Sequence, residues 1–248
     1  MEMGSKIRLG VIGLGVMGAE MLDVAQRHPR FEVVVAADPS EQAVERARAA
    51  QPAPAYVGDP DELLGRRALD AVYIASPPAT HAHYAVRAMK AGLAVFAEKP
   101  LAVDLAEGEE MVTVAAATGT VNALNFVMSD RGAALAVAEA LRTGQAGTVR
   151  GVEMRFTFPE WPRSFQESAG WVAGRAQGGF LREVASHYLF LTDRLLGPLS
   201  PVRTHVTYGA AAEDTAYESP EDLGGLPRRR LGTQTRVMMG RWRVPAGP

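Results

Sequence analysis

The sequence predicts an α/β protein: a doubly wound parallel sheet in the first half, then a smaller α+β domain with an open mixed sheet. Short β-rich runs alternate with helical patterns through the first half, which is typical of βαβ units. A glycine-rich turn joins the first such run to the first helix. Residues 149–158 then alternate apolar and polar side chains, which predicts a strand with one strongly apolar face.

The elements of the first half follow from local composition. Phe31–Ala37 is a nearly continuous apolar run, which suits a parallel strand buried on both faces. Gly92 ends one helix at the C′ position, and Asp104 with Glu107 forms a capping box that starts another. We therefore expect strands at 6–12, 31–37, 55–57, 69–75, 93–97 and 121–126, and helices at 16–26, 40–50, 80–91 and from 104 onward.

The second half has fewer elements, and its pattern ends early. We expect a helix over 129–143, a strand over 149–158, a loop over 159–177, a helix over 178–196 and a strand over 202–208. Residues 221–248 then carry six arginines against two acidic side chains. We interpret this segment as a solvated end rather than a nucleic-acid-binding arm, because no helical or aromatic pattern accompanies the charge. The predicted domains are 1–123 and 124–248, the latter ending in an irregular tail over 209–248 that fits no strand of the sheet.

Overall composition excludes several classes of protein. The formal charge of −2, from 26 basic and 28 acidic side chains, argues against a nucleic-acid partner. The chain has no cysteine, which excludes disulfides and cysteine-bound metals, and its histidines are too scattered to predict a metal site. No apolar run reaches the roughly 18 residues of a membrane span, and the N-terminus does not read as a signal peptide. These features favour a cytoplasmic protein.

The glycine-rich turn has the pattern G-x-G-x-x-G. Gly13 permits a tight turn, Gly15 lets the backbone approach a pyrophosphate, and Gly18 lets helix and strand pack closely. Val16 and Met17 belong to the helix N-terminus, whose N–H groups favour anions. The turn therefore predicts a dinucleotide-binding site of the Rossmann type.

Asp38 ends the next strand, 20 residues after Gly18. A carboxylate there accepts hydrogen bonds from the adenine ribose and repels a 2′-phosphate, which favours NAD over NADP. Ser40 keeps NADP as an alternative. The competing interpretation is that Asp38 only opens an Asp-Pro-Ser turn.

Two further segments follow strands at the same edge of the sheet. Ser76, Pro77 and His81 come after the fourth strand, and Glu98 and Lys99 come after the fifth. Open α/β sheets bind ligands at this edge. The chain has 23 arginines and only three lysines, so the lysine here is notable. Unlike arginine, a lysine can exchange a proton near neutral pH when burial and a positive neighbour lower its pKa.

These segments together resemble the Gfo/Idh/MocA oxidoreductases, the family of glucose-fructose oxidoreductase and inositol dehydrogenase. The resemblance runs from Lys6 to about Tyr208. It rests on GLGVMG at 13–18, Asp38, SPPATHAHYAVRAMKAGLAVFAEKPLA at 76–102, QAGTV at 145–149 and GGFLREVASHYLFLTDRLLG at 178–197. It implies an NAD(P)-dependent enzyme that moves a hydride between nicotinamide and a secondary alcohol or ketone of a sugar, polyol or related small molecule.

The resemblance also implies roles for single residues. Lys99 would bind the substrate hydroxyl and exchange its proton, and Glu183 and His187 match an Asp and a His four residues apart in the family. Glu183 departs from the usual aspartate. Asn125 counts among the candidate cofactor-binding residues. Asn125-Phe126-Val127 stands where many members have Asn-x-Arg, so we expect no arginine contact to substrate at this position.

Family members continue well past the point where this chain ends, so we expect a shortened member whose incomplete C-terminal sheet favours a homo-oligomer. Two other interpretations remain open. The chain could bind dinucleotide without turnover, as a sensor or partner subunit, or it could use NAD transiently within a hydrolysis or elimination.

Overall fold

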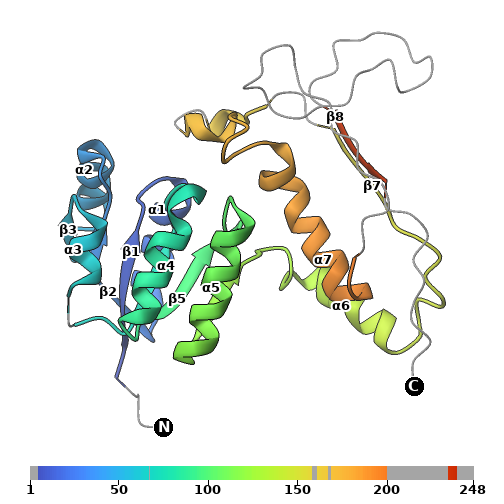
Figure 1. The fold of residues 1–248 in the computed structure, drawn as a ribbon, viewed down its shortest axis with the longest axis horizontal. Coiled ribbons are helices and arrows are strands. Elements are labelled where there is room, and N and C mark those ends of the chain that lie inside the picture. Colours follow the sequence, from blue (N-terminus) through green and yellow to red (C-terminus); the bar gives the residue numbers. More distant parts are fainter. Residues whose placement is uncertain (1–4, 67, 158–160, 167–168, 200–233, 239–248) are drawn as a thin grey trace. The chain divides into compact units, whose positions relative to one another are not determined.

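The computed structural model describes residues 5–66, 68–157, 161–166, 169–199 and 234–238. The chain divides into two compact units, Met1–Asn125 and Phe126–Pro248 (Figure 1). This division falls two residues after the boundary expected from the sequence. Each unit is described separately below as unit 1 and unit 2.

Unit 1 contains a six-stranded sheet in the order β3-β2-β1-β4-β5-β6, with parallel pairing throughout. The order reverses between β1 and β4, which is the switch point of a doubly wound sheet. The predicted fold class is confirmed here. The strands are β1 (Ile7–Ile12), β2 (Phe31–Ala37), β3 (Ala55–Val57), β4 (Ala71–Ile74), β5 (Ala94–Glu98) and β6 (Asn122–Asn125).

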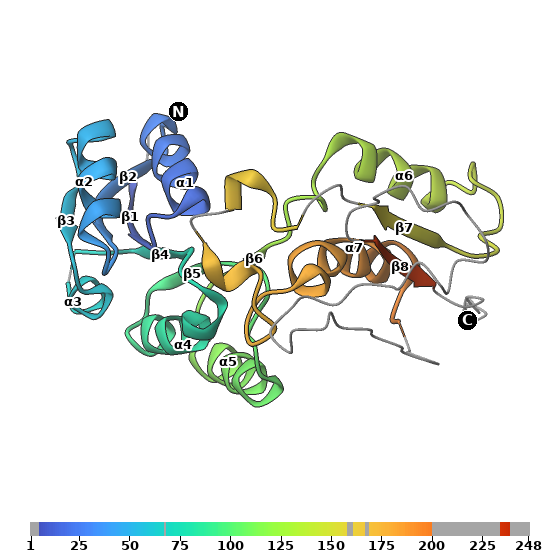
Figure 2. The ribbon, with the colours of Figure 1, turned by 90° about the horizontal axis from the view of Figure 1, so that it is seen from above.

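Helices cover both faces of this sheet. Figure 2 shows α1 and α2 on one face and α3, α4 and α5 on the other. Polar side chains define several of their starts: Ser40 Oγ accepts from the Ala43 N–H (3.3 Å), and Asp104 accepts from the Ala106 N–H (2.7 Å). The helices are α1 (Val16–Arg27), α2 (Glu41–Ala50), α3 (Pro60–Leu64), α4 (His81–Lys90) and α5 (Leu105–Thr118).

The short helix α3 is absent from the elements expected from the sequence. It has five residues, too few to show a helical period. Its start is nevertheless encoded locally, because Asp59 caps it through the Asp61 N–H at 2.9 Å and Pro60 occupies its first turn.

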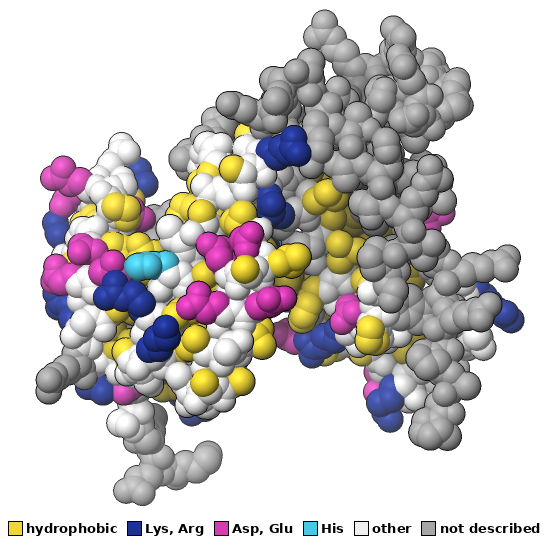
Figure 3. All heavy atoms as spheres, in the orientation of Figure 1, with side chains coloured by type: hydrophobic (Ala, Val, Ile, Leu, Met, Phe, Trp, Pro, Cys, Tyr) yellow, Lys and Arg dark blue, Asp and Glu magenta, His cyan; other side chains and the backbone are white. Residues whose placement is uncertain are grey.

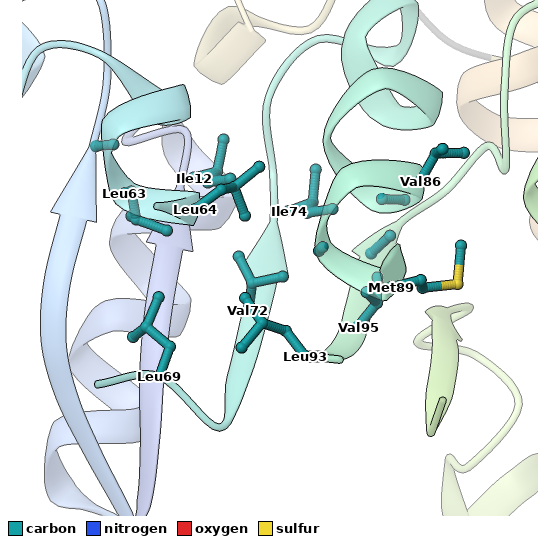
Figure 4. Close-up of a cluster of buried hydrophobic side chains, with 14 of the residues drawn as sticks. Ile12, Leu63, Leu64, Leu69, Val72, Ile74, Val86, Met89, Leu93 and Val95 are labelled. Atoms are coloured by element: carbon teal, nitrogen blue, oxygen red, sulfur yellow. The ribbon is translucent and has the colours of Figure 1, made fainter. Parts of the chain in front are cut away.

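Alternate strand residues feed two hydrophobic clusters, one on each face. Val72 and Ile74 of β4 join the cluster drawn in Figure 4, where they meet Leu63 of α3 and Met89 of α4. Tyr73, between them in the sequence, belongs to the cluster on the opposite face. Burying each such aliphatic side chain contributes about 1.5–3 kcal/mol, so these two layers hold the sheet and its ligand edge in place.

Unit 2 combines helices with a small sheet. A π-helical turn, Leu181–Ala185, leads into α7, and a cluster that includes Phe156 and Phe180 forms the core. Short 3₁₀ turns at Ser164–Gln166 and Gly170–Val172 lie in the expected loop. The elements are α6 (Gly132–Arg142), β7 (Glu153–Thr157), α7 (Ser186–Leu196) and β8 (Gln234–Met238).

Strand β8 corrects the expectation that the tail after residue 209 contributes no strand. Residues 234–238 pair antiparallel with β7, from Thr157 opposite Gln234 to Glu153 opposite Met238. The sequence there is QTRVM, and its β-branched residues alternate in the way that strands favour. The surrounding arginine bias hid this short pattern. The strand expected over 202–208 lies outside the described residues, and mixed pairing in this sheet stays a prediction.

Opposite charges are interspersed on the face of unit 1 seen in Figure 3. Arg87 pairs with Asp61, and Arg66 Nη2 lies 2.9 Å from Glu62 Oε1. Such exposed pairs contribute only about 0–1 kcal/mol each. Because each of these basic side chains has an acidic neighbour, they do not form the continuous basic surface that binding to a phosphate backbone requires. The absence of a nucleic-acid partner stays a prediction.

One ion pair joins two neighbouring strands at the edge opposite the ligand edge. Asp70 accepts from the backbone N–H of Arg8 at 2.8 Å and from its guanidinium at 2.7 and 3.0 Å. These hydrogen bonds lower the pKa of Asp70 from 3.8 to about 2. The carboxylate therefore ties the segment before β4 to β1.

We expect Asp70→Asn to destabilise unit 1 at neutral pH. A depressed pKa adds stability that is complete above the unfolded value of 3.8 and is lost as the pH falls towards about 2. Urea unfolding of wild type and variant across this range measures the difference in unfolding free energy. A difference that stays constant down to pH 2 contradicts the role given to this carboxylate.

Candidate cofactor and proton-transfer sites

The glycine-rich turn lies between β1 and α1, and its three glycines have different environments. Gly13 has φ +89°, and a Cβ there would lie 2.6 Å from the backbone of Ala75 and Ser76. A Cβ on Gly18 would lie 1.8 Å from the Gly13 carbonyl oxygen, so helix and strand meet at a distance that only glycine allows. A Cβ on Gly15 would meet no atom within 4 Å.

Gly15 is also the N-cap of α1, and no side chain caps this helix. Val16 and Met17, in the first turn, are 48% and 37% exposed. Backbone N–H groups at such a terminus attract anions, and the open space at Gly15 admits a phosphate to close range. The turn thus fits a pyrophosphate.

Asp38 lies directly beside this turn. Its Oδ2 accepts from the Leu14 N–H at 2.7 Å, and its Oδ1 accepts from the Ser40 N–H at 2.8 Å. Two hydrogen bonds therefore fix the carboxylate next to the glycines, while each oxygen keeps a second lone pair. The Ser40 hydroxyl is engaged as the cap of α2. The spacing along the sequence located Asp38, but the contact with Leu14 emerges only from the structure.

His81 joins the two loops that follow β4 and β5. Its ring is 1% exposed, with Nδ1 2.8 Å from the Pro100 carbonyl oxygen and Nε2 2.9 Å from that of Ser76. Burial is the largest influence on this ring and lowers its pKa, whereas the two carbonyls act in the opposite direction. Thr80 adds a link within the first loop, its Oγ1 lying 2.7 Å from Ser76 Oγ and 2.8 Å from the Pro77 carbonyl oxygen. His81 thus fixes these loops from inside, and its direct contact with a cofactor stays a prediction.

Glu98 is the last residue of β5 and is 6% exposed. Its Oε1 accepts from the Tyr73 hydroxyl and, at 2.7 Å, from Asn125 Nδ2. These three side chains come from the adjacent strands β4, β5 and β6. Lys99 follows immediately and is partly buried, and its peptide bond to Pro100 is cis.

Tyr73 is the residue of this group that the sequence analysis missed. A signal was present, since a tyrosine inside a buried parallel strand needs a partner for its hydroxyl. Burial, followed by the charge of Glu98, raises its pKa, so the phenol keeps its proton and donates it.

Glu183 and His187 belong to unit 2. Glu183 is 7% exposed and sits in the π-helical turn, a feature frequent at functional sites. The rings of His187 and Phe126 form a T-shaped pair, with their centroids 5.7 Å apart and an interplanar angle of 89°. Arg163 lies close enough to Glu183 that the carboxylate raises its pKa against the larger, lowering effect of burial.

The structure thus brings the predicted residues together in three groups. The glycine turn adjoins Asp38; Ser76 meets the loop of Lys99 through His81; and Glu98 meets Asn125. Lys99 belongs to unit 1, whereas Glu183 and His187 belong to unit 2.

Two further properties concern the described residues alone. Within those ranges, no group of three histidine, aspartate or glutamate side chains could hold a metal ion. In the same part of the chain, no helix is long and apolar enough to span a membrane.

Several known proteins are similar to this chain in sequence. Residues 7–126 match the model of an oxidoreductase family with an NAD-binding Rossmann fold. A dTDP-3,4-didehydro-2,6-dideoxy-α-D-glucose 3-reductase from Streptomyces violaceoruber is 36% identical over 201 residues, which cover 79% of this chain and 56% of the reductase. Inositol 2-dehydrogenase 1 from Saccharopolyspora erythraea is 37% identical over 115 residues, covering 46% of this chain and 34% of the dehydrogenase.

Solved structures agree in fold. The WlbA dehydrogenase from Bordetella pertussis, crystallised with NADH and UDP-GlcNAcA, superposes with a TM-score of 0.76 at 24% identity, covering 94% of this chain and 71% of that one. The chain spans a little over half the length of the reductase that it matches. The glycine turn, the doubly wound sheet and the sequence matches converge: residues 7–126 of this chain match the Gfo/Idh/MocA oxidoreductase family.

Proposed function

We propose that this protein is an NAD-dependent oxidoreductase acting on a secondary alcohol or ketone of a sugar, polyol or related small molecule. The observation that carries the proposal is the glycine cradle at the start of α1 with the Asp38 carboxylate fixed beside it. A dinucleotide needs both features, one for its pyrophosphate and one for its adenine ribose. The names of the reductase and dehydrogenase relatives support the substrate class.

NAD fits Asp38 better than NADP does. The carboxylate has lone pairs left for the two ribose hydroxyls after accepting from Leu14 and Ser40. A 2′-phosphate would meet this fixed negative charge. The Ser40 hydroxyl accepts a hydrogen bond as the cap of α2 and can still donate its own O–H, so NADP is the alternative cofactor.

The proton-transfer roles rest on residue type and on the family resemblance described above. When bound, the nicotinamide cofactor supplies the hydride acceptor or donor. Lys99, next to Glu98 at the ligand edge, exchanges the proton of the substrate oxygen. His187 is its proposed partner in proton transfer, and Glu183 orients and charges that histidine.

Two broader proposals accompany this function. We place the protein in the cytoplasm, a reducing compartment with which a chain without cysteine is compatible. We also propose a homo-oligomer that assembles through the sheet of β7 and β8, since strand edges invite pairing with a second copy.

Gly15→Ala should weaken NADH binding at least tenfold while changing the unfolding free energy by no more than about 1 kcal/mol, because its methyl group enters open space where phosphates approach. Gly18→Ala should instead destabilise the fold by roughly 2–3 kcal/mol or more, since its methyl group meets the Gly13 carbonyl. Fluorescence titration and thermal unfolding separate the two effects. Unchanged NADH affinity in Gly15→Ala contradicts a pyrophosphate site at this turn.

Asp38→Ala and Asp38→Asn should both narrow the preference for NADH over NADPH by about tenfold or more, as expected when hydrogen bonds to a charged group are lost. Titration of both nucleotides measures the ratio of dissociation constants. Glu110→Gln, which removes an exposed charge from α5, serves as the control and should keep the wild-type ratio. A ratio unchanged in both Asp38 variants removes Asp38 from ribose recognition.

Lys99→Ala and Lys99→Arg should each lower kcat by about 10²–10⁴-fold, because neither side chain exchanges a proton near neutral pH. The assay is a panel of sugars, polyols and nucleotide sugars with NAD or NADH. Lys90→Ala, at an exposed position of α4, should match wild type. Full activity of Lys99→Arg would show that only the charge matters, and NADH binding without turnover of any substrate favours the sensor interpretation.

A further inference from the structure

Glu98 is a buried acidic residue at the ligand edge. The role proposed for Lys99 in proton transfer does not explain why an acid is buried there. It is 6% exposed, and a buried carboxylate is costly unless donors satisfy it. The Tyr73 hydroxyl and Asn125 Nδ2 both donate hydrogen bonds to the same oxygen, Glu98 Oε1. Both hydrogen bonds are donated to Glu98, and donors of this kind are the partners that a buried carboxylate requires.

Tyr73 and Asn125 are positioned to hold this charge in place. Tyr73 is fully buried on β4, and Asn125 ends β6 on the other side of Glu98. Asn125 also hydrogen-bonds the phenol itself, an interaction that acts on Tyr73 against the effect of burial. The three side chains therefore close a small polar network across three adjacent strands.

The place of Glu98 in the sheet points to the redox-active half of a dinucleotide. A doubly wound sheet has two mononucleotide-binding halves, which meet at the switch point between β1 and β4. Asp38, after β2, marks β1–β3 as the adenine half. The half formed by β4–β6 is left for nicotinamide, and Glu98, Tyr73 and Asn125 all lie in it.

We propose that the buried Glu98 carboxylate sets the preference of this protein for the oxidised over the reduced nicotinamide cofactor, and that Tyr73 and Asn125 are positioning residues for that charge. This inference rests on the proposed function. The two cofactor forms differ by one positive charge on the nicotinamide ring, so a fixed negative charge in the nicotinamide half stabilises NAD⁺ relative to NADH. The effect acts through space and needs no direct contact.

Dissociation constants of NAD⁺ and NADH, measured by calorimetry on the full chain without substrate, test the proposal. For Glu98→Gln we expect NAD⁺ affinity to fall about tenfold relative to NADH affinity, the size of effect that one charge exerts over roughly 10 Å at an intermediate dielectric. Tyr73→Phe, which removes only the hydroxyl, should shift the same ratio in the same direction by less. Glu110→Gln removes an exposed charge and should leave the ratio within about twofold.

The outcomes separate this inference from the proposed function. A wild-type chain that binds neither form overturns the proposed function and, with it, this inference. Tight binding of both forms with the ratio unchanged in Glu98→Gln and Tyr73→Phe overturns the inference alone. If Glu98→Gln fails to fold, Tyr73→Phe decides, because a conservative loss of one hydroxyl preserves the packing of the ring against Phe96.

Discussion

The close approach of α1 to the end of β1 is the contact on which unit 1 depends. A side chain at residue 18 would meet the Gly13 carbonyl oxygen, and one at residue 13 would meet the backbone that follows β4. Glycine at both positions lets β1, α1 and β4 converge on one point. The helix N-terminus then opens directly at the ligand edge, and Asp38 reaches the Leu14 N–H from β2. The glycine-rich turn thereby determines that the N-terminus of α1 is where the ligand edge attracts anions.

Much of the fold could be predicted because parallel strands buried on both faces are encoded as continuous apolar runs. β2 and β3 have the bounds expected from the sequence, and the ends of the other strands of this sheet differ by one or two residues. The misses have physical causes. The five residues of α3 carry a cap but no period, and β8 gains its partner from β7, more than 70 residues away in the sequence. A strand that is stabilised by a partner distant in the sequence has only a weak signal in its own residues.

The candidate sites divide in the same way. Gly13, Gly15, Gly18 and Asp38 lie within a single βαβ unit, so their spacing predicts their proximity. The contact between Tyr73, Glu98 and Asn125 depends instead on which strands are neighbours, and sequence spacing of 25 and 27 residues does not reveal it. Similarly, the pattern of Glu183 and His187 predicts a common helical face, but the π-helical turn around Glu183 has a different hydrogen-bond register from an α-helix.

Buried carboxylates mark both candidate proton-transfer sites. Among the described residues, Glu98 and Glu183 are the buried acids; Glu98 directly precedes Lys99 in the sequence, and Glu183 is four residues before His187. Replacing buried ionic groups by apolar residues of similar volume often leaves the free energy of unfolding unchanged or raises it. Stability alone therefore does not explain why such groups are present. Each is instead matched by specific partners: Glu98 by two hydrogen-bond donors, and Glu183 by Arg163, whose pKa this carboxylate raises against the effect of burial. The cost of burying two carboxylates, each with specific partners, therefore points to a role in chemistry rather than in packing.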